Sequence, residues 1–200
     1  MPLNPSEMTR REFVGTAIAA PATLGALAVG GVVFLTPTPA CGDDDHKPTP
    51  EDIEGPYFKA KSPERKSLVE KTDKGVKMTL KGRVLSTKGQ PVAKALLDFW
   101  HCDAEGEYDN DTFKHRGHLF TDEHGNYELE TIFPGEYPGR ARHIHVKAQA
   151  PKGPILTTQL YFPDEPNNKK DNFFKQALVM KVENAKAGKA AAFDFVLKLA

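Results

Sequence analysis

Short segments in which apolar and polar residues alternate run through the chain. At 76–80, Val76, Met78 and Leu80 alternate with lysine and threonine, and apolar residues at every second position repeat the pattern at 193–199. Alternation of this period is typical of β-strands with one buried face. Segments rich in β-branched and aromatic residues indicate further strands. The predicted strands span 76–80, 83–86, 96–102, 127–133, 143–148, 155–162 and 192–199.

Glycine-containing turns separate these segments at fairly even spacing. Lys88-Gly89-Gln90 and His124-Gly125-Asn126 are two of them, and turns of this kind connect neighbouring strands. The pattern predicts at most one short helix, at 172–179, which follows a polar loop at 164–171. We therefore expect an all-β fold, an antiparallel β-sandwich with long loops.

The N-terminal part of the chain differs from the rest. Arg10-Arg11 precede an apolar run at 14–35 that is rich in alanine and glycine, and small residues follow at 38–40. This pattern predicts a twin-arginine-type signal peptide at 1–41. A membrane anchor is the alternative, but the glycines, alanines and Pro21 make the run only weakly hydrophobic for a membrane-spanning segment. We expect an exported protein that is periplasmic, extracellular or lipid-anchored at the cell surface.

The segment at 42–50 is charged and rich in proline, and this composition predicts a flexible tether. Residues 51–200 then form a single domain, long enough to bury a hydrophobic core. The two cysteines do not form a C-x-x-C metal motif. Cys41 lies where a lipid-modified cysteine would follow a signal, and this lipid is the only link to a membrane that we expect. Cys102 lies in an apolar run and is predicted to be buried.

The charge balance narrows the classes of partner. Lysine plus arginine (27) equal aspartate plus glutamate (27), so the basic surface expected of a nucleic-acid-binding protein is missing. We therefore expect no nucleic-acid partner.

Two histidines and two tyrosines are candidate metal ligands. His143 and His145 are two residues apart in a predicted strand, so both side chains leave the same face while Ile144 points to the other. Tyr137 lies six residues before His143, and Tyr108 lies further upstream. Ferric iron is a hard Lewis acid that suits phenolate oxygens, with imidazole as an acceptable companion. Each feature is weak alone, because a His-x-His pair more often lies on a solvated face.

A series of motifs resembles those of the intradiol ring-cleavage dioxygenases, over about 49–195 and in the family's order. With no room for an N-terminal helical domain, the chain is similar to a compact exported branch of that family. The motifs include Glu54-Gly55-Pro56-Tyr57, Asp98-Phe99-Trp100-His101, Gly106-Glu107-Tyr108-Asp109, Arg116-Gly117, Thr131 to Pro138, Arg140 to His145 and Leu156 to Phe162.

The resemblance implies a non-haem Fe(III) enzyme that uses O2 to cleave the ring of a catechol-type substrate between its two hydroxyls, giving a cis,cis-muconate-type diacid. Arg140 and Gln159 match the active-site pair that acts in catalysis and contacts substrate. Tyr137 matches the phenolate that leaves the metal when substrate binds, and Tyr57 is expected to line the cleft. A homo-oligomer is among the open possibilities. The four ligands of the family match Tyr108, Tyr137, His143 and His145.

The chain departs from the family pattern in two places. Ala141 stands where the family usually has proline, and His101-Cys102 replace the commoner Gln-Ala. We expect both changes to affect the cleft rather than the metal ligands. The remaining histidines, which we expect at the surface, are His46, His115, His118 and His124.

Two other functions remain open from the sequence. One is a non-catalytic, exported, transthyretin-like sandwich that binds a carbohydrate or a protein, with the phenols and imidazoles lining a groove. The other is a zinc or copper protein that uses His143 and His145. Zinc would favour a further histidine or a carboxylate over two tyrosines.

Overall fold

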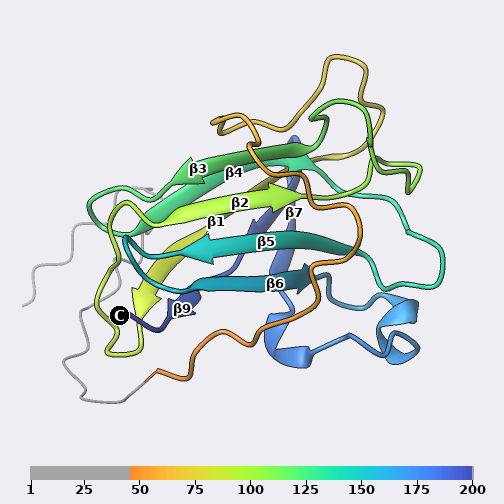
Figure 1. Cartoon of the computed structure of the whole chain (residues 1–200). Coiled ribbons are helices and arrows are strands. Elements are labelled where there is room, and N and C mark those ends of the chain that lie inside the picture. The colour runs from red at the N-terminus through yellow and green to blue at the C-terminus, as the bar shows by residue number, and fades with distance from the viewer. Residues whose placement is uncertain (1–45, 200) are drawn as a thin grey trace, which may run out of the picture. The chain divides into compact units, whose positions relative to one another are not determined.

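Two β-sheets packed face to face form the part of the chain that the computed structural model describes, residues 46–199 (Figure 1). Most neighbouring strands are antiparallel, and β8 and β9 run parallel to β1. The predicted all-β sandwich is confirmed. One sheet has the order β3 (Arg116–Phe120), β2 (Leu96–Trp100), β5 (His143–Gln149) and β6 (Ile155–Tyr161). The other has the order β4 (Asn126–Ile132), β1 (Lys77–Ser86), β8 (Gly188–Ala192) and β7 (Lys181–Ala185), with β9 (Phe195–Leu197) also beside β1.

The hydrophobic core lies between the two sheets. Met78 and Leu80 of β1 belong to the same buried cluster as Ile144 and Val146 of β5. Each fully buried side chain of this kind contributes roughly 1.5–3 kcal/mol. The inward face of β5 is therefore used for packing, and its outward face carries the two histidines.

The strands predicted at 76–80 and 83–86 are one continuous strand, β1. Gly82, at the expected break, pairs with Tyr127 of β4. A Cβ at Gly82 would lie 1.8 Å from the carbonyl oxygen of Phe193. This glycine therefore permits a close approach of backbone segments, and it does not mark a turn.

The alternation pattern misses β3, β7 and β8. Strand β8 has the sequence Gly-Lys-Ala-Ala-Ala, which lacks the β-branched and aromatic residues favoured in strands. It forms because its backbone pairs with β1 on one side and β7 on the other. The described residues contain no α-helix: 172–179 include only the 3₁₀ helix η2 (Gln176–Leu178), and the polar loop at 164–171 contains another, η1 (Pro166–Lys169).

One of the four histidines expected at the surface is buried. His115 is 3% exposed, and its Nε2 lies 3.0 Å from a carboxylate oxygen of Asp73. The prediction fails because His115 immediately precedes β3, a strand that the pattern misses. His46 and His124 are exposed as predicted, whereas His118 is partly buried and bonded to Ser62.

A segment at 49–63 crosses the outward face of the four-stranded sheet, and Figure 1 shows it in orange near the ends of β5 and β2. Asp52 N–H donates to the carbonyl of Thr157 in β6, and the carbonyl of Pro63 accepts from the N–H of His118 in β3. Between these contacts, Gly55 lies against His145 of β5. Residues 49–63, the crossing segment, thereby cover side chains that would otherwise face solvent.

The end of the predicted tether also packs on the domain. Within residues 46–50, Thr49 is buried, and it exchanges hydrogen bonds with the backbone of Val196. These contacts hold 46–50 against β9, in contrast to the flexible segment expected there. The predicted signal at 1–41, Cys41 and the start of the tether lie outside the described residues. Within 46–199, no helix is long and apolar enough to span a bilayer.

Replacing Phe99 with alanine should lower the free energy of unfolding by about 3–5 kcal/mol, because the side chain is fully buried between the sheets. Urea denaturation followed by circular dichroism measures this loss. Phe120→Ala is the matched control: Phe120 is 45% exposed, and its loss should cost about 0.5 kcal/mol. Equal losses would contradict the core as described.

Candidate metal centre

Three candidate ligand atoms converge at one end of the four-stranded sheet. The Tyr108 hydroxyl oxygen lies 3.3 Å from His143 Nε2 and 3.1 Å from His145 Nε2, and the two nitrogens are 3.1 Å apart. All three side chains are buried. The structure therefore brings a phenol and two imidazoles into mutual contact. We call Tyr108, His143 and His145 the donor triad.

The geometry of the donor triad fits a metal ion. Nitrogen or oxygen ligands about 2.1 Å from a metal and at right angles to each other are about 3 Å apart, close to the separations in the triad. The Nδ1–H of His143 donates to the carbonyl of Ala141 at 2.6 Å. This hydrogen bond fixes the tautomer, so Nε2 of His143 presents its lone pair to the other two donors.

Burial sets the protonation of the donor triad. It lowers the pKa of His143 to about 4 and lowers the pKa of His145 well below its usual value. Both rings are therefore neutral at pH 7, as metal ligands must be. Burial raises the pKa of Tyr108, so the protein alone keeps this phenol protonated. A bound cation would supply the charge that favours the phenolate.

Tight packing between two loops positions Tyr108. Gly106 adopts φ +92°, and a Cβ there would lie 2.3 Å from the carbonyl oxygen of Glu136. Asp103 closes the turn by accepting the N–H of Glu107 at its side chain. The close approach at Gly106 places the Tyr108 and Tyr137 rings edge to face, with centroids 5.7 Å apart.

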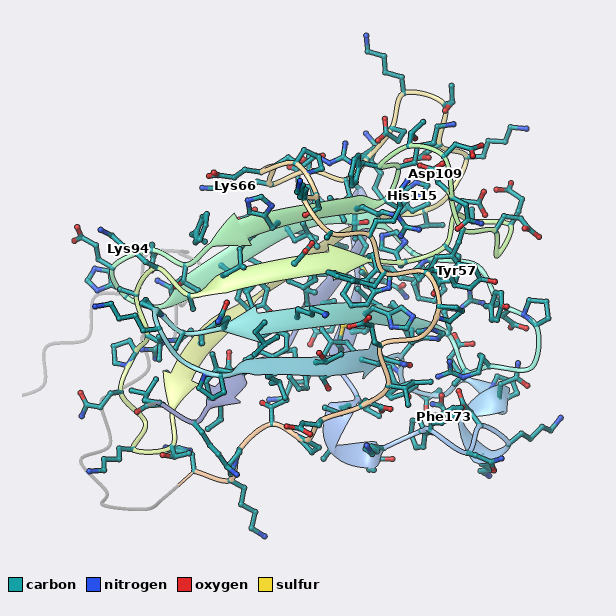
Figure 2. The ribbon with its side chains drawn as sticks, viewed as in Figure 1. Tyr57, Lys66, Lys94, Asp109, His115 and Phe173 are labelled. Carbon is teal, nitrogen blue, oxygen red and sulfur yellow. The ribbon has the colours of Figure 1, made fainter. Side chains whose placement is uncertain are left out.

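Tyr57 connects the two predicted phenol ligands. Its ring stacks on Tyr108 at 4.2 Å, and its hydroxyl lies 2.9 Å from the hydroxyl of Tyr137. The hydrogen bond with Tyr137 is the largest cause of a raised Tyr57 pKa. Figure 2 shows Tyr57 at the same end of the sandwich as Phe173. The structure thus groups three tyrosines, with Tyr57 and Tyr137 partly exposed.

Arg140 and Gln159 also lie at this end. Gln159 is opposite His145 in the pairing of β6 with β5. Its side-chain oxygen accepts from Nη2 of Arg140 at 2.8 Å, while its amide N–H donates to the carbonyl of Ile53. The two predicted active-site residues are therefore bonded to each other, and the crossing segment fixes the orientation of the glutamine.

Sequence reasoning does not identify three further neighbours of the donor triad. Trp100 stacks on His145 with ring centroids 4.8 Å apart and an interplanar angle of 4°. The guanidinium of Arg116, 1% exposed, lies 5.9 Å from the Tyr108 ring centroid. Gly55 contacts His145. The motifs around these residues are signals that could have identified them, but their contacts depend on strand pairing and on the crossing segment.

His101 and Cys102 lie behind the site. His101 Nε2 is 2.6 Å from the Thr131 hydroxyl, and its ring stacks on His115. Burial lowers the pKa of His101 to about 3 and raises that of Cys102 to about 12. Cys102 is buried as predicted, and its protonated thiol is unreactive at neutral pH.

The ligand types disfavour a zinc site of the usual kind. Within residues 46–199, no group of three or more His, Cys, Asp and Glu side chains is placed to hold a metal. The side chain in contact with both His143 and His145 is the phenol of Tyr108, and phenols suit ferric iron better than zinc.

Fold and site together define a β-sandwich protein with a buried imidazole–phenol donor set. A family model described as "Dioxygenase" matches residues 53–199. The chain belongs to the intradiol dioxygenase family.

Curated relatives and solved structures agree with this family. Catechol 1,2-dioxygenase of Candida albicans is 31% identical, over 61% of this chain and 50% of its own length. Catechol 1,2-dioxygenase 2 of Acinetobacter lwoffii is 30% identical, over 71% of this chain and 62% of its own length. The dioxygenase domain of a dioxygenase carbohydrate-binding protein fusion from Streptomyces sp. SirexAA-E is 53% identical, with a TM-score of 0.75, over 77% of this chain and 100% of that one. The chain thus spans one half to two thirds of the length of these two curated relatives.

Gly55→Ala should weaken metal binding at the donor triad. Its Cβ would lie 3.2 Å from Cε1 of His145, in a backbone conformation with φ +72°. Displacing a ligand through its packing neighbour should lower iron affinity about 10-fold or more, measured by competition with a chelator. Gly89→Ala is the matched control: its φ is +71°, and its Cβ would meet only the side chain of exposed His46. Similar affinity losses in both variants would contradict the prediction.

The buried His101 should make stability depend on pH. Its folded pKa of about 3 lies below the unfolded value of 6.5, so protons bind preferentially to the unfolded chain and stability falls from pH 7 towards pH 3. Between pH 7 and pH 5, the free energy of unfolding should fall by about 2 kcal/mol because of this histidine. His101→Gln should show a correspondingly smaller loss in urea denaturation at the two pH values. The same pH dependence in both proteins would exclude His101 as its source.

Proposed function

We propose that this chain is a non-haem Fe(III) dioxygenase that opens the ring of a catechol-type substrate between its two hydroxyls with O2, giving a cis,cis-muconate-type diacid. The observation that carries the proposal is the donor triad, in which one phenol and two neutral imidazoles lie within 3.3 Å of one another. Family membership supports it, because the curated relatives described above are catechol 1,2-dioxygenases.

In this proposal Tyr137 completes the ligand set that the donor triad begins. Two phenolates and two neutral imidazoles suit a hard trivalent cation. When bound, the ferric ion would act as a Lewis acid that binds the diol and activates its ring towards O2.

Tyr137 is the ligand best placed to exchange with substrate. It is partly exposed, whereas Tyr108 is buried. Its hydroxyl already has a partner in the hydroxyl of Tyr57, 2.9 Å away. Tyr137 can therefore take up a proton from an arriving diol at its oxygen and remain hydrogen-bonded to Tyr57.

Arg140 and Gln159 are the polar side chains that would face the substrate. Arg140 is held by its neighbours before substrate arrives, so its positive charge needs little reorganisation to stabilise negative charge that develops on the substrate. The crossing segment and Trp100 keep bulk water from the imidazoles, because both histidines are almost fully buried.

We also propose that the protein acts outside the cytoplasm, after export through the twin-arginine signal expected at 1–41. The twin-arginine route carries proteins that have already folded, and the proposed metal site forms only in the folded domain.

The function is tested with purified, iron-loaded protein and a panel of catechol, protocatechuate and hydroxyquinol. We expect a visible absorption band from iron-bound phenolate and uptake of one O2 per ring cleaved. A colourless iron-loaded protein that consumes no O2 would favour a non-catalytic binding module instead.

Two variants separate metal binding from turnover. His145→Ala should lose iron, whereas Arg140→Ala should keep iron and lose about 100-fold in kcat. Metal content by mass spectrometry and O2 uptake measure the two effects. Arg83→Ala, on β1 of the other sheet, controls for loss of a positive charge. An Arg140→Ala variant with unchanged turnover would remove Arg140 from the mechanism.

A further inference from the structure

Sequence reasoning assigns no role to Asp171, yet its carboxylate is bonded to Arg140. It follows η1 in the loop between β6 and β7, and its side chain is 1% exposed. Two residues further on, Phe173 lies at the same end of the sandwich as Tyr57 in Figure 2. A carboxylate this deeply buried needs several partners.

Three N–H groups supply those partners. Arg140 Nε and the backbone N–H of Ala141 both donate to one carboxylate oxygen at 2.8 Å, and the backbone N–H of Phe173 donates to the other at 2.9 Å. Burial by itself opposes ionisation of Asp171, but the hydrogen bonds outweigh it, and the pKa lies below its usual value. Asp171 is therefore a carboxylate at neutral pH.

The first contact restrains Arg140. Asp171 holds Nε while Gln159 accepts from Nη2, and the guanidinium carbon lies 4.9 Å from the ring centroid of Phe173. Within residues 46–199, Nη1 of Arg140 donates to no protein acceptor. Two of the five N–H groups of the guanidinium are therefore bonded, and both N–H groups of Nη1 remain for a ligand.

The second contact reaches the donor triad. The peptide N–H of Ala141 is bonded to Asp171, and the carbonyl of the same residue accepts the Nδ1–H of His143. One carboxylate thus restrains the short segment between Arg140 and His143 at two points. Displacement of the Asp171 carboxylate would therefore affect both the guanidinium of Arg140 and the Ala141 carbonyl that orients the His143 ring.

We propose that Asp171 is a positioning residue whose carboxylate fixes both the guanidinium of Arg140 and the backbone of Ala141 beside the donor triad. Its effect on turnover rests on the proposed function, whereas its effect on the guanidinium does not. Because Asp171 acts through Arg140, its removal should cost turnover without removing the metal.

A double-mutant cycle tests this coupling. Asp171→Asn should keep iron and lower kcat 10- to 100-fold, and the double variant Asp171→Asn/Arg140→Ala should be no slower than Arg140→Ala within about twofold. If the two residues act as one unit, the loss of kcat caused by Asp171→Asn disappears once Arg140 has been replaced. Losses that multiply in the double variant would show that Asp171 acts independently of Arg140, and would overturn the proposal.

A second readout uses metal-free protein. In heteronuclear NMR spectra, the Arg140 Nε–H signal, assigned by its loss in Arg140→Lys, should exchange with solvent at least 10-fold faster in Asp171→Asn. Asp164→Asn is the matched control, because Asp164 is an exposed aspartate in the same loop; it should leave both the exchange rate and kcat unchanged. An unaltered exchange rate in Asp171→Asn would overturn the proposal.

The two readouts also separate this inference from the proposed function. If the wild-type protein cleaves no catechol, the proposed function fails, and the NMR comparison still decides whether Asp171 holds the guanidinium. If Asp171→Asn does not fold, Asp171→Glu takes its place in the NMR comparison, because it keeps the charge but moves the carboxylate relative to Arg140 and Ala141. The Arg140 Nε–H signal should then exchange faster than in the wild-type protein, and an unaltered exchange rate would overturn the proposal.

Discussion

The burial of two imidazoles on the outward face of β5 is the constraint on which the rest of the site depends. A strand in a sandwich usually turns this face to water, but here the segment at 49–63 crosses it and leaves His143 and His145 almost without exposed surface. Buried polar atoms need partners, and those at hand are each other, the Tyr108 hydroxyl and the Ala141 carbonyl. Both rings are therefore neutral, and the hydrogen bond from Nδ1–H of His143 to Ala141 turns the Nε2 lone pair of His143 towards the Tyr108 hydroxyl and His145.

The side chains around the donor triad form two groups, the tyrosines on one side and Arg140 with its partners on the other. Tyr108 is buried, and its loop is locked by the close approach at Gly106. Tyr137 is more exposed, and its hydroxyl is bonded to that of Tyr57. On the other side, Arg140 is bonded to both Asp171 and Gln159. One phenol is thus buried, one is more accessible, and the guanidinium of Arg140 is held by two hydrogen bonds. In the proposed function, this arrangement would let substrate replace Tyr137 before charge develops.

Strand pairing brings the residues of the site together from distant parts of the chain. Pairing of β5 with β6 places Gln159 opposite His145, and pairing of β5 with β2 places Trp100 opposite the same histidine. The loop between β6 and β7 then returns Asp171 to the segment that precedes His143. Chain segments distant in sequence thus meet at one end of one sheet, and the opposite face of that sheet supplies the core.

The sequence by itself determined the sandwich class and the face of β5 that carries His143 and His145, because strand periodicity is a local property of the chain. It also singled out Tyr108, Tyr137, Arg140 and Gln159 through motif resemblance. The tertiary structure alone decided that Ala-rich β8 is a strand, that His115 is buried, and that Gly55, Trp100 and Asp171 surround the site. These features depend on strand pairing and loop crossings between distant segments, and local periodicity carries no information about such contacts.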